Sequence, residues 1–166
     1  MEHRLMATAF LFNGERVLMM RKRGSRLYDA EFWSGLGGHL EPCELGCPME
    51  ACLREIEEES GIRAGEMTGL RLRYILLRLK EDEIRQQFVY FGQTEKTDLR
   101  ASDEGELFWI DRKDWRSVPV SRIIACMMDY EEKHPDKWEV MVGTMSLDQD
   151  GRPAVQWSAL NDPVVF

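Results

Sequence analysis

The sequence predicts an α+β fold with one mixed β-sheet and two main helices. Apolar runs typical of β-strands recur along the chain with turn residues between them, and two segments show the apolar spacing of three and four that is typical of helices. The chain has 166 residues, 43% of them hydrophobic, which is enough for one ordinary core. We therefore expect a single domain over residues 1–166.

The expected strands are mostly paired across turn residues. The runs are 5–12 and 16–21 around Asn13-Gly14, 70–79 and 84–92 around a charged turn, 106–111, and 138–147 and 154–160 around an Asp-Gly turn. Asn-Gly and Asp-Gly favour the tight turns that join antiparallel strands. We expect an opening hairpin, a second antiparallel pair, a single strand and a C-terminal hairpin.

Two helices are expected, of which the first has clearer boundaries. Pro48 suits a first helical position, good helix formers follow to Ser60, and Gly61 ends the segment. On a helical wheel, one arc is apolar (Met49, Cys52, Leu53, Ile56) and another is acidic (Glu55, Glu58, Glu59). The second helix covers 120–133 and ends at His134-Pro135. The glycine-rich segment 22–47 is expected to be loop with short strand pieces.

Charge and composition disfavour several classes of function. The formal net charge of -8 disfavours binding to nucleic acid polymers or to anionic membranes. No secretory signal and no run of membrane-spanning length is visible. Three of the four cysteines (Cys43, Cys47, Cys52, Cys126) fall in one short segment, unlike a disulfide framework. His39, Cys43 and Cys47 lack the second ligand pair of a structural zinc site. We expect free thiols and a cytoplasmic protein.

The acidic arc of the first helix suggests chemistry. Glu55, Glu58 and Glu59 lie within about one turn of each other, where repulsion costs a few tenths of a kcal/mol per pair, roughly. Magnesium prefers oxygen ligands, so a carboxylate stripe beside a flexible glycine loop suits metal-bridged phosphates. A solvated acidic surface is the common alternative for such a stripe taken alone.

The surrounding residues resemble the Nudix box. The matching positions, in order over about 38–62, are Gly38, Glu44, Arg54, Glu55, Ile56, Glu58, Glu59, Gly61 and Ile62. One departure is that nine residues, 45–53, separate Glu44 from Arg54 where the family pattern has seven. Placing the two extra residues at Leu45-Gly46 keeps the helical spacing intact, but it leaves the role of Glu44 less secure than the roles of the helical glutamates.

The resemblance implies an α/β/α sandwich with a C-terminal helix and hairpin at about 120–160. It also implies hydrolysis of a phosphoric anhydride with Mg²⁺, or Mn²⁺ in its place, as cofactor. Glu55, Glu58 and Glu59 would be the metal ligands, the Gly38 carbonyl a further ligand, and Arg54 the residue that orients the acids. The metal would activate the attacking water. Glu55 or Glu104 would take its proton, and for Glu104 a solvated loop position is the alternative.

The segment before the box resembles the corresponding loop of hydrolases that act on oxidised purine nucleoside triphosphates. Arg21 and Arg23 would meet phosphates, Trp33 would line a base pocket or pack in the core, and Gly37 would border the substrate. Ser34 stands where a base-reading asparagine would fall, which weakens the purine assignment.

The preferred reaction is therefore cleavage of a nucleoside triphosphate, an oxidised purine form among the candidates, to monophosphate and pyrophosphate. ADP-ribose, sugar nucleotides and dinucleoside polyphosphates are alternative substrates, and a non-catalytic nucleotide sensor is an alternative of another class. The isoprenoid diphosphate isomerases rank last, because no cysteine is placed for that chemistry.

The terminal hairpin leaves the oligomeric state open. Met141, Val142, Met145 and Trp157 would supply the apolar surface of a homodimer, or they would pack in the core of one chain.

Overall fold

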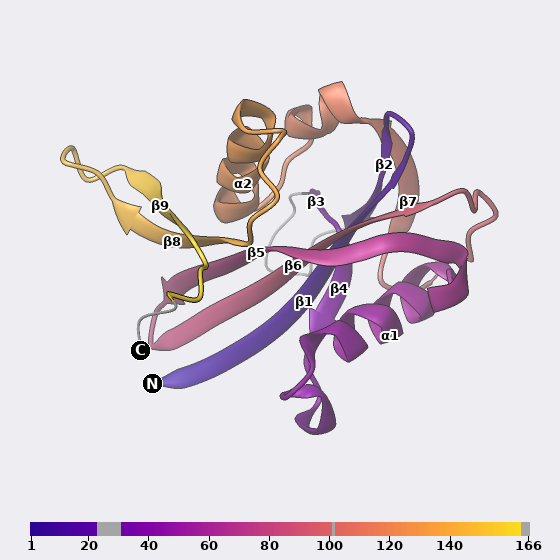
Figure 1. The fold of residues 1–166 in the computed structure, drawn as a ribbon, viewed down its shortest axis with the longest axis horizontal. Helices are drawn as coiled ribbons and strands as arrows, with labels where there is room; N and C mark the ends of the chain where they lie inside the picture. Colours follow the sequence, from indigo (N-terminus) through magenta and orange to yellow (C-terminus); the bar gives the residue numbers. More distant parts are fainter. Residues whose placement is uncertain (23–30, 101, 164–166) are drawn as a thin grey trace.

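The computed structural model describes residues 1–22, 31–100 and 102–163 (Figure 1). The described strands are β1 (Glu2–Asn13), β2 (Arg16–Lys22), β3 (Phe32–Ser34), β4 (Leu36–His39), β5 (Met67–Lys80), β6 (Glu83–Thr94), β7 (Glu106–Asp111), β8 (Met141–Leu147) and β9 (Pro153–Ala159). The helices are α1 (Pro48–Ser60) and α2 (Arg122–Lys133), together with the short 3-10 helices η1 (Pro42–Glu44), η2 (Ala64–Glu66) and η3 (Arg112–Ser117).

The strands form one mixed sheet, as the sequence predicts. Its main order is β3-β2-β1-β6-β5-β8-β9, with β1 parallel to β6 and β5 parallel to β8. One edge of β1 serves two partners, because residues 6–9 pair with β4 and residues 11–13 pair with β2. This division brings the glycine-rich strand β4 beside the first half of β1.

The two faces of the sheet are covered by different helices (Figure 1). Alternate side chains of a strand point to opposite faces. Phe10 and Phe12 of β1 accordingly lie in the cluster that includes α2, whereas Ala7, Ala9 and Leu11 lie in the cluster that includes α1. The α/β/α sandwich expected from the resemblance is confirmed, and α1 is held against the face that carries β4.

Local sequence signals locate several boundaries. Asn13 pairs with Arg16 across the first turn, and Gly14 has the positive φ of 58° that this turn needs. Helix α1 has the predicted bounds, with Gly61 left-handed at φ 75° and its N–H donating to the Glu57 carbonyl. The second helix begins at Arg122, two residues later than expected, with Ser121 at the N-cap.

The C-terminal hairpin is confirmed with one correction. Strand β8 begins at Met141 and not at Trp138, whose side chain is exposed with its ring centroid 4.0 Å from the Arg71 guanidinium. Met141 is buried, and Met145 and Trp157 pack against the cluster that includes α2. Packing within one chain therefore accounts for these three apolar residues.

Two further expectations concern thiols and membranes. The four cysteines are free, as predicted. Across the described ranges, neither helix has the length and apolar character needed to cross a membrane.

Candidate active site

Close packing of α1 against β4 creates the candidate active site. Gly37 and Gly38 of β4 pair with Thr8 and Ala7 of β1. A Cβ atom at Gly37 would lie 2.1 Å from the Ala7 carbonyl oxygen, and one at Gly38 would lie 2.4 Å from Oε1 of Glu55. The glycines thus allow the acidic side of α1 to meet the backbone of β4.

Arg54 donates hydrogen bonds to three carboxylates of the acidic cluster. Its Nε donates to Oε1 of Glu44 at 2.7 Å and its Nη2 to Oε2 at 3.0 Å, a two-pronged pairing. Its Nη1 donates to Glu55 at 2.8 Å and to Glu58 at 3.2 Å. The hydrogen bond from Arg54 lowers the pKa of Glu44, and Glu44 raises the pKa of Arg54. Both side chains are therefore held in their charged forms.

The two extra residues of the box do not separate Glu44 from Arg54. Leu45 is 55% exposed, and nothing approaches the position of a Cβ at Gly46. Glu44 itself is buried at the end of η1, where it also accepts a hydrogen bond from the Glu41 N–H at 2.8 Å. The insertion therefore bulges into solvent between η1 and α1.

Glu59 is the most unusual carboxylate of the cluster. It is 2% exposed and accepts a hydrogen bond from the Gly37 N–H at 2.7 Å. Burial raises the pKa of Glu59 to about 7, against the opposing effects of this hydrogen bond and of Lys22. Within the described residues it forms no ion pair, so its charge lacks the partner that Arg54 gives to Glu44.

Lys22 and Glu104 lie beside this cluster. The Lys22 Nζ is 4.0 Å from the Glu104 carboxylate, and both charges act on the pKa of Glu59. Glu104 therefore lies near Glu59 of the helical glutamates. Lys22 was not predicted as a site residue, but strand alternation could have identified it, because Arg21 and Lys22 must face opposite sides of β2.

Arg21 and Trp33 form a second group around Phe108. Arg21 pairs with Glu106 at 2.8 Å, and its guanidinium lies 4.8 Å from the Phe108 ring centroid. The Trp33 ring lies 5.3 Å from the same ring and packs against the core that includes α2. Arg23, the other predicted phosphate contact, lies outside the described residues.

Ser34 follows Trp33 in β3. Its hydroxyl oxygen is buried and has no hydrogen-bond partner among the residues that the structure describes. Buried hydroxyls normally have a hydrogen-bond partner, so the Ser34 hydroxyl is an exception among the described residues.

The carboxylate oxygens of the glutamates are suitable ligands for a hard divalent cation. In this structure the same carboxylates accept hydrogen bonds from protein groups. In the described ranges, no group of three or more His, Cys, Asp or Glu side chains converges as a ready metal site. Arg54 engages Glu55 and Glu58, and the Gly37 N–H engages Glu59. Glu59 is nevertheless a buried carboxylate that forms no ion pair within the part of the chain that the structure describes, and the charges of Glu55 and Glu104 act on it. Carboxylate oxygens are the ligands that magnesium prefers.

An α/β/α sandwich with a glutamate-bearing helix packed on a glycine strand defines the class of Nudix-type hydrolases. The sequence matches the NUDIX domain family over residues 2–141. The chain therefore belongs to the Nudix family and is a Nudix hydrolase.

Solved structures share the fold at low sequence identity. A MutT protein from Bacillus halodurans is 19% identical, with 93% of this chain and 97% of that chain covered and a TM-score of 0.70. A C. elegans Ap4A hydrolase is 15% identical (81% and 98% covered, TM-score 0.63). A Streptococcus suis ADP-ribose pyrophosphatase is 14% identical (82% and 96% covered, TM-score 0.57). The comparison with curated protein sequences gave no match. These likenesses define the fold and not the substrate.

Proposed function

We propose that the chain hydrolyses a nucleoside triphosphate to the monophosphate and pyrophosphate, with Mg²⁺, or Mn²⁺ in its place, held by Glu55, Glu58 and Glu59. The observation that carries the proposal is Glu59, which is 2% exposed with a pKa raised to about 7. A bound cation would favour its charged form. The Gly38 carbonyl is the further ligand suggested by the close approach of β4 to Glu55.

The bound metal would neutralise phosphate charge and make a water molecule more acidic. Arg54 positions Glu55 and Glu58, and buried Glu44 in turn fixes Arg54. The water oxygen bonds to phosphorus as the bond from phosphorus to the leaving phosphate oxygen breaks. Glu104 is proposed to accept the water proton, with Glu55 as the alternative base, since both carboxylates act on Glu59. No covalent enzyme intermediate is required.

The residues around Phe108 lie on the opposite face of the sheet from the glutamates, beside the edge strand β3, and they are proposed to hold the part of the substrate that extends past this edge. Trp33 offers an aromatic ring and Arg21 a guanidinium. Arg23 and Gly37 complete the proposed substrate contacts. A purine ring, including an oxidised purine, would stack on this aromatic surface.

The similar structures also suggest substrates other than a nucleoside triphosphate. The similar structures include an Ap4A hydrolase and an ADP-ribose pyrophosphatase, so dinucleoside polyphosphates, ADP-ribose and sugar nucleotides belong in the same assay. A sensor that binds nucleotide without cleaving it is the alternative of another class. We further propose that the chain acts as one domain over residues 1–166, in the cytoplasm, on small nucleotides and not on nucleic acid polymers.

The test is an activity panel with magnesium, covering nucleoside triphosphates, their oxidised purine forms, ADP-ribose and dinucleoside polyphosphates. Glu58→Gln serves as the variant, because the Glu58 side chain is 59% exposed and the change should leave the fold intact. We expect pyrophosphate from a triphosphate, lost in Glu58→Gln and on removal of the metal. If the protein turned over ADP-ribose and no triphosphate, ADP-ribose would replace the nucleoside triphosphates as the substrate class. Binding without turnover of any compound would establish the sensor alternative.

A further inference from the structure

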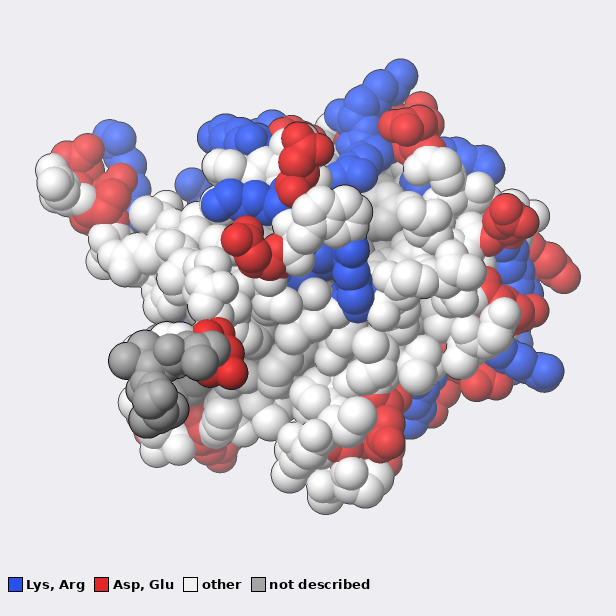
Figure 2. Space-filling model, viewed as in Figure 1, with Lys and Arg blue, Asp and Glu red and all other residues white. Residues whose placement is uncertain are grey.

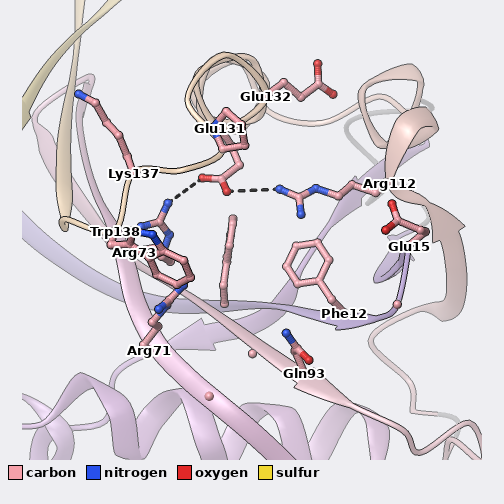
Figure 3. A pocket seen from close by; sticks show the side chains of 15 residues that line it. Phe12, Glu15, Arg71, Arg73, Gln93, Arg112, Glu131, Glu132, Lys137 and Trp138 are labelled. Carbon is pink, nitrogen blue, oxygen red and sulfur yellow. Dashed lines mark hydrogen bonds and ion pairs between the residues drawn. The ribbon is translucent and has the colours of Figure 1, made fainter.

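A cavity lies on the opposite face of the sheet from α1. It has a volume of about 520 Å³ and is lined by β5, β6, the β1–β2 turn, Arg112 and the segment that follows α2 (Figure 3). The volume is within the range of ligand pockets, roughly 300–1,000 Å³. Basic side chains are visible between α2 and β5 in Figure 2, where this cavity lies.

The cavity is lined by more basic residues than acidic ones. Its basic residues are Arg71, Arg73, Arg112 and Lys137, and its acidic residues are Glu15, Glu131 and Glu132. Figure 3 shows Arg73 and Arg112 reaching Glu131 from two sides, at 3.1 Å and 3.3 Å. Glu132 is engaged by Arg116 at 2.8 Å. Two of the three carboxylates are therefore already paired.

Arg71 and Lys137 remain available to a ligand. Among the described residues, neither forms an ion pair. The Arg71 guanidinium lies 4.0 Å from the Trp138 ring centroid, and the Lys137 ammonium donates to the Tyr130 hydroxyl at 3.2 Å. A guanidinium and an ammonium at one cavity can bind phosphate oxygens, and guanidinium does so with two parallel hydrogen bonds.

Aromatic surface accompanies these charges. Trp138 is 68% exposed beside Arg71, and the rings of Phe12 and Phe91 line the same cavity. Exposed tryptophan is well suited to stack on a flat ring. The combination of phosphate-binding groups with a stacking surface matches a phosphate ester that carries a planar ring.

The cavity is separate from the glutamate cluster. Ala7 pairs with Gly38 of the active site, whereas Phe12 lines the cavity, and the two residues are five positions apart on β1. That separation is about 17 Å along a strand. Their side chains also face opposite sides of the sheet. A ligand in the cavity would therefore lie away from the carboxylates that we assign to catalysis.

We propose that this cavity is an accessory binding site for a nucleotide-sized phosphate monoester, with Arg71 and Lys137 holding the phosphate and Trp138 contacting the ring. The binding requires no divalent metal, because its charges come from the protein. It does not depend on the catalytic proposal.

Calorimetric titration of metal-free protein with AMP tests the proposal. We expect saturable binding that weakens about tenfold or more in Arg71→Ala and in Lys137→Gln, since each variant removes a charged contact. Both side chains are at the surface, so the variants should fold, which circular dichroism would check. Lys133→Gln is the matched control, because Lys133 is an exposed lysine of α2 that does not line the cavity.

Further controls distinguish the cavity from the active site. Adenosine, which lacks the phosphate, should bind far more weakly than AMP, and Glu58→Gln should leave AMP binding at the cavity unchanged. Trp138→Ala should also weaken AMP binding. The proposal is overturned if metal-free protein does not bind AMP, if adenosine binds equally well, or if the Arg71→Ala/Lys137→Gln double variant keeps the full affinity and stoichiometry.

Discussion

Replacing Arg54 by alanine should destabilise the fold by about 3 kcal/mol at neutral pH. The Glu44 side chain is 7% exposed, and Arg54 supplies hydrogen bonds to both of its carboxylate oxygens. Alanine would leave that carboxylate buried, with the Glu41 N–H as its one remaining donor among the described residues. Removing one partner of a buried ion pair costs about 3–5 kcal/mol, and the 25% exposure of Arg54 places the effect at the lower end because water can enter.

The effect of Arg54→Ala should depend on pH in a defined direction. Arg54 holds the pKa of Glu44 below its unfolded value of about 4.3. The stabilisation is therefore present above about pH 4.3 and is lost as the pH falls through the folded pKa. Urea unfolding followed by tryptophan fluorescence at pH 7, 5 and 3.5 would measure the free energy of unfolding of both proteins. The difference between them should shrink at the lowest pH.

An exposed arginine gives the control for this experiment. Arg63 is 78% exposed and lies 3.8 Å from Glu57, so Arg63→Ala should change the free energy of unfolding by less than about 0.5 kcal/mol. The reasoning would be refuted if Arg54→Ala cost less than about 1 kcal/mol at pH 7. A difference between Arg54→Ala and wild type that does not vary with pH would also refute it.

Three other substitutions test the packing and charges of the fold. Glu59→Gln should stabilise the metal-free protein by up to about 3 kcal/mol at pH 8 and by less than about 1 kcal/mol at pH 5, because a folded pKa of about 7 means that stability is lost as the pH rises. Thermal unfolding at both pH values checks this, and equal effects would contradict it. Gly37→Ala should cost about 2 kcal/mol in urea unfolding, because its methyl group would meet the Ala7 carbonyl at 2.1 Å, and wild-type stability would exclude the clash. Tyr74→Phe should cost about 1–2 kcal/mol in the same assay by removing a buried donor to Glu131, and a neutral result would show that the Arg73 contact suffices.

The elements that the sequence predicts best are those defined by local signals. Helix α1 begins at Pro48 and ends before Gly61 because both residues act on their own backbone conformation. The first hairpin follows from Asn13-Gly14 for the same reason. Strand β8 was extended too far, because the apolar Trp138 was counted with the strand although its ring lies on Arg71 outside the sheet.

The contacts of the candidate site depend on non-local pairing and could not be predicted in detail. The helical wheel placed Glu59 on the same arc as Glu55 and Glu58. The burial of Glu59, however, results from the pairing of β4 with β1. Similarly, sequence spacing allowed an ordinary surface pair between Arg54 and Glu58, whereas the fold gives Arg54 a buried partner in Glu44. The resemblance to the Nudix box identified these residues, and the tertiary structure determines which of them are paired.

The two faces of this sheet should respond differently to metal and salt. The chain has a net charge of -8, and Arg54 pairs with three of the four carboxylates in the cluster of Glu44, Glu55, Glu58 and Glu59. A phosphate brought to this cluster adds negative charge to negative charge, so its binding should require a divalent cation. The cavity on the other face offers Arg71 and Lys137, which form no ion pair with the described carboxylates, so a phosphate there should bind without metal and its binding should weaken as salt screens the charges. Titrations with and without magnesium at low and high salt would separate the two sites, because only one of the two binding events should need the cation.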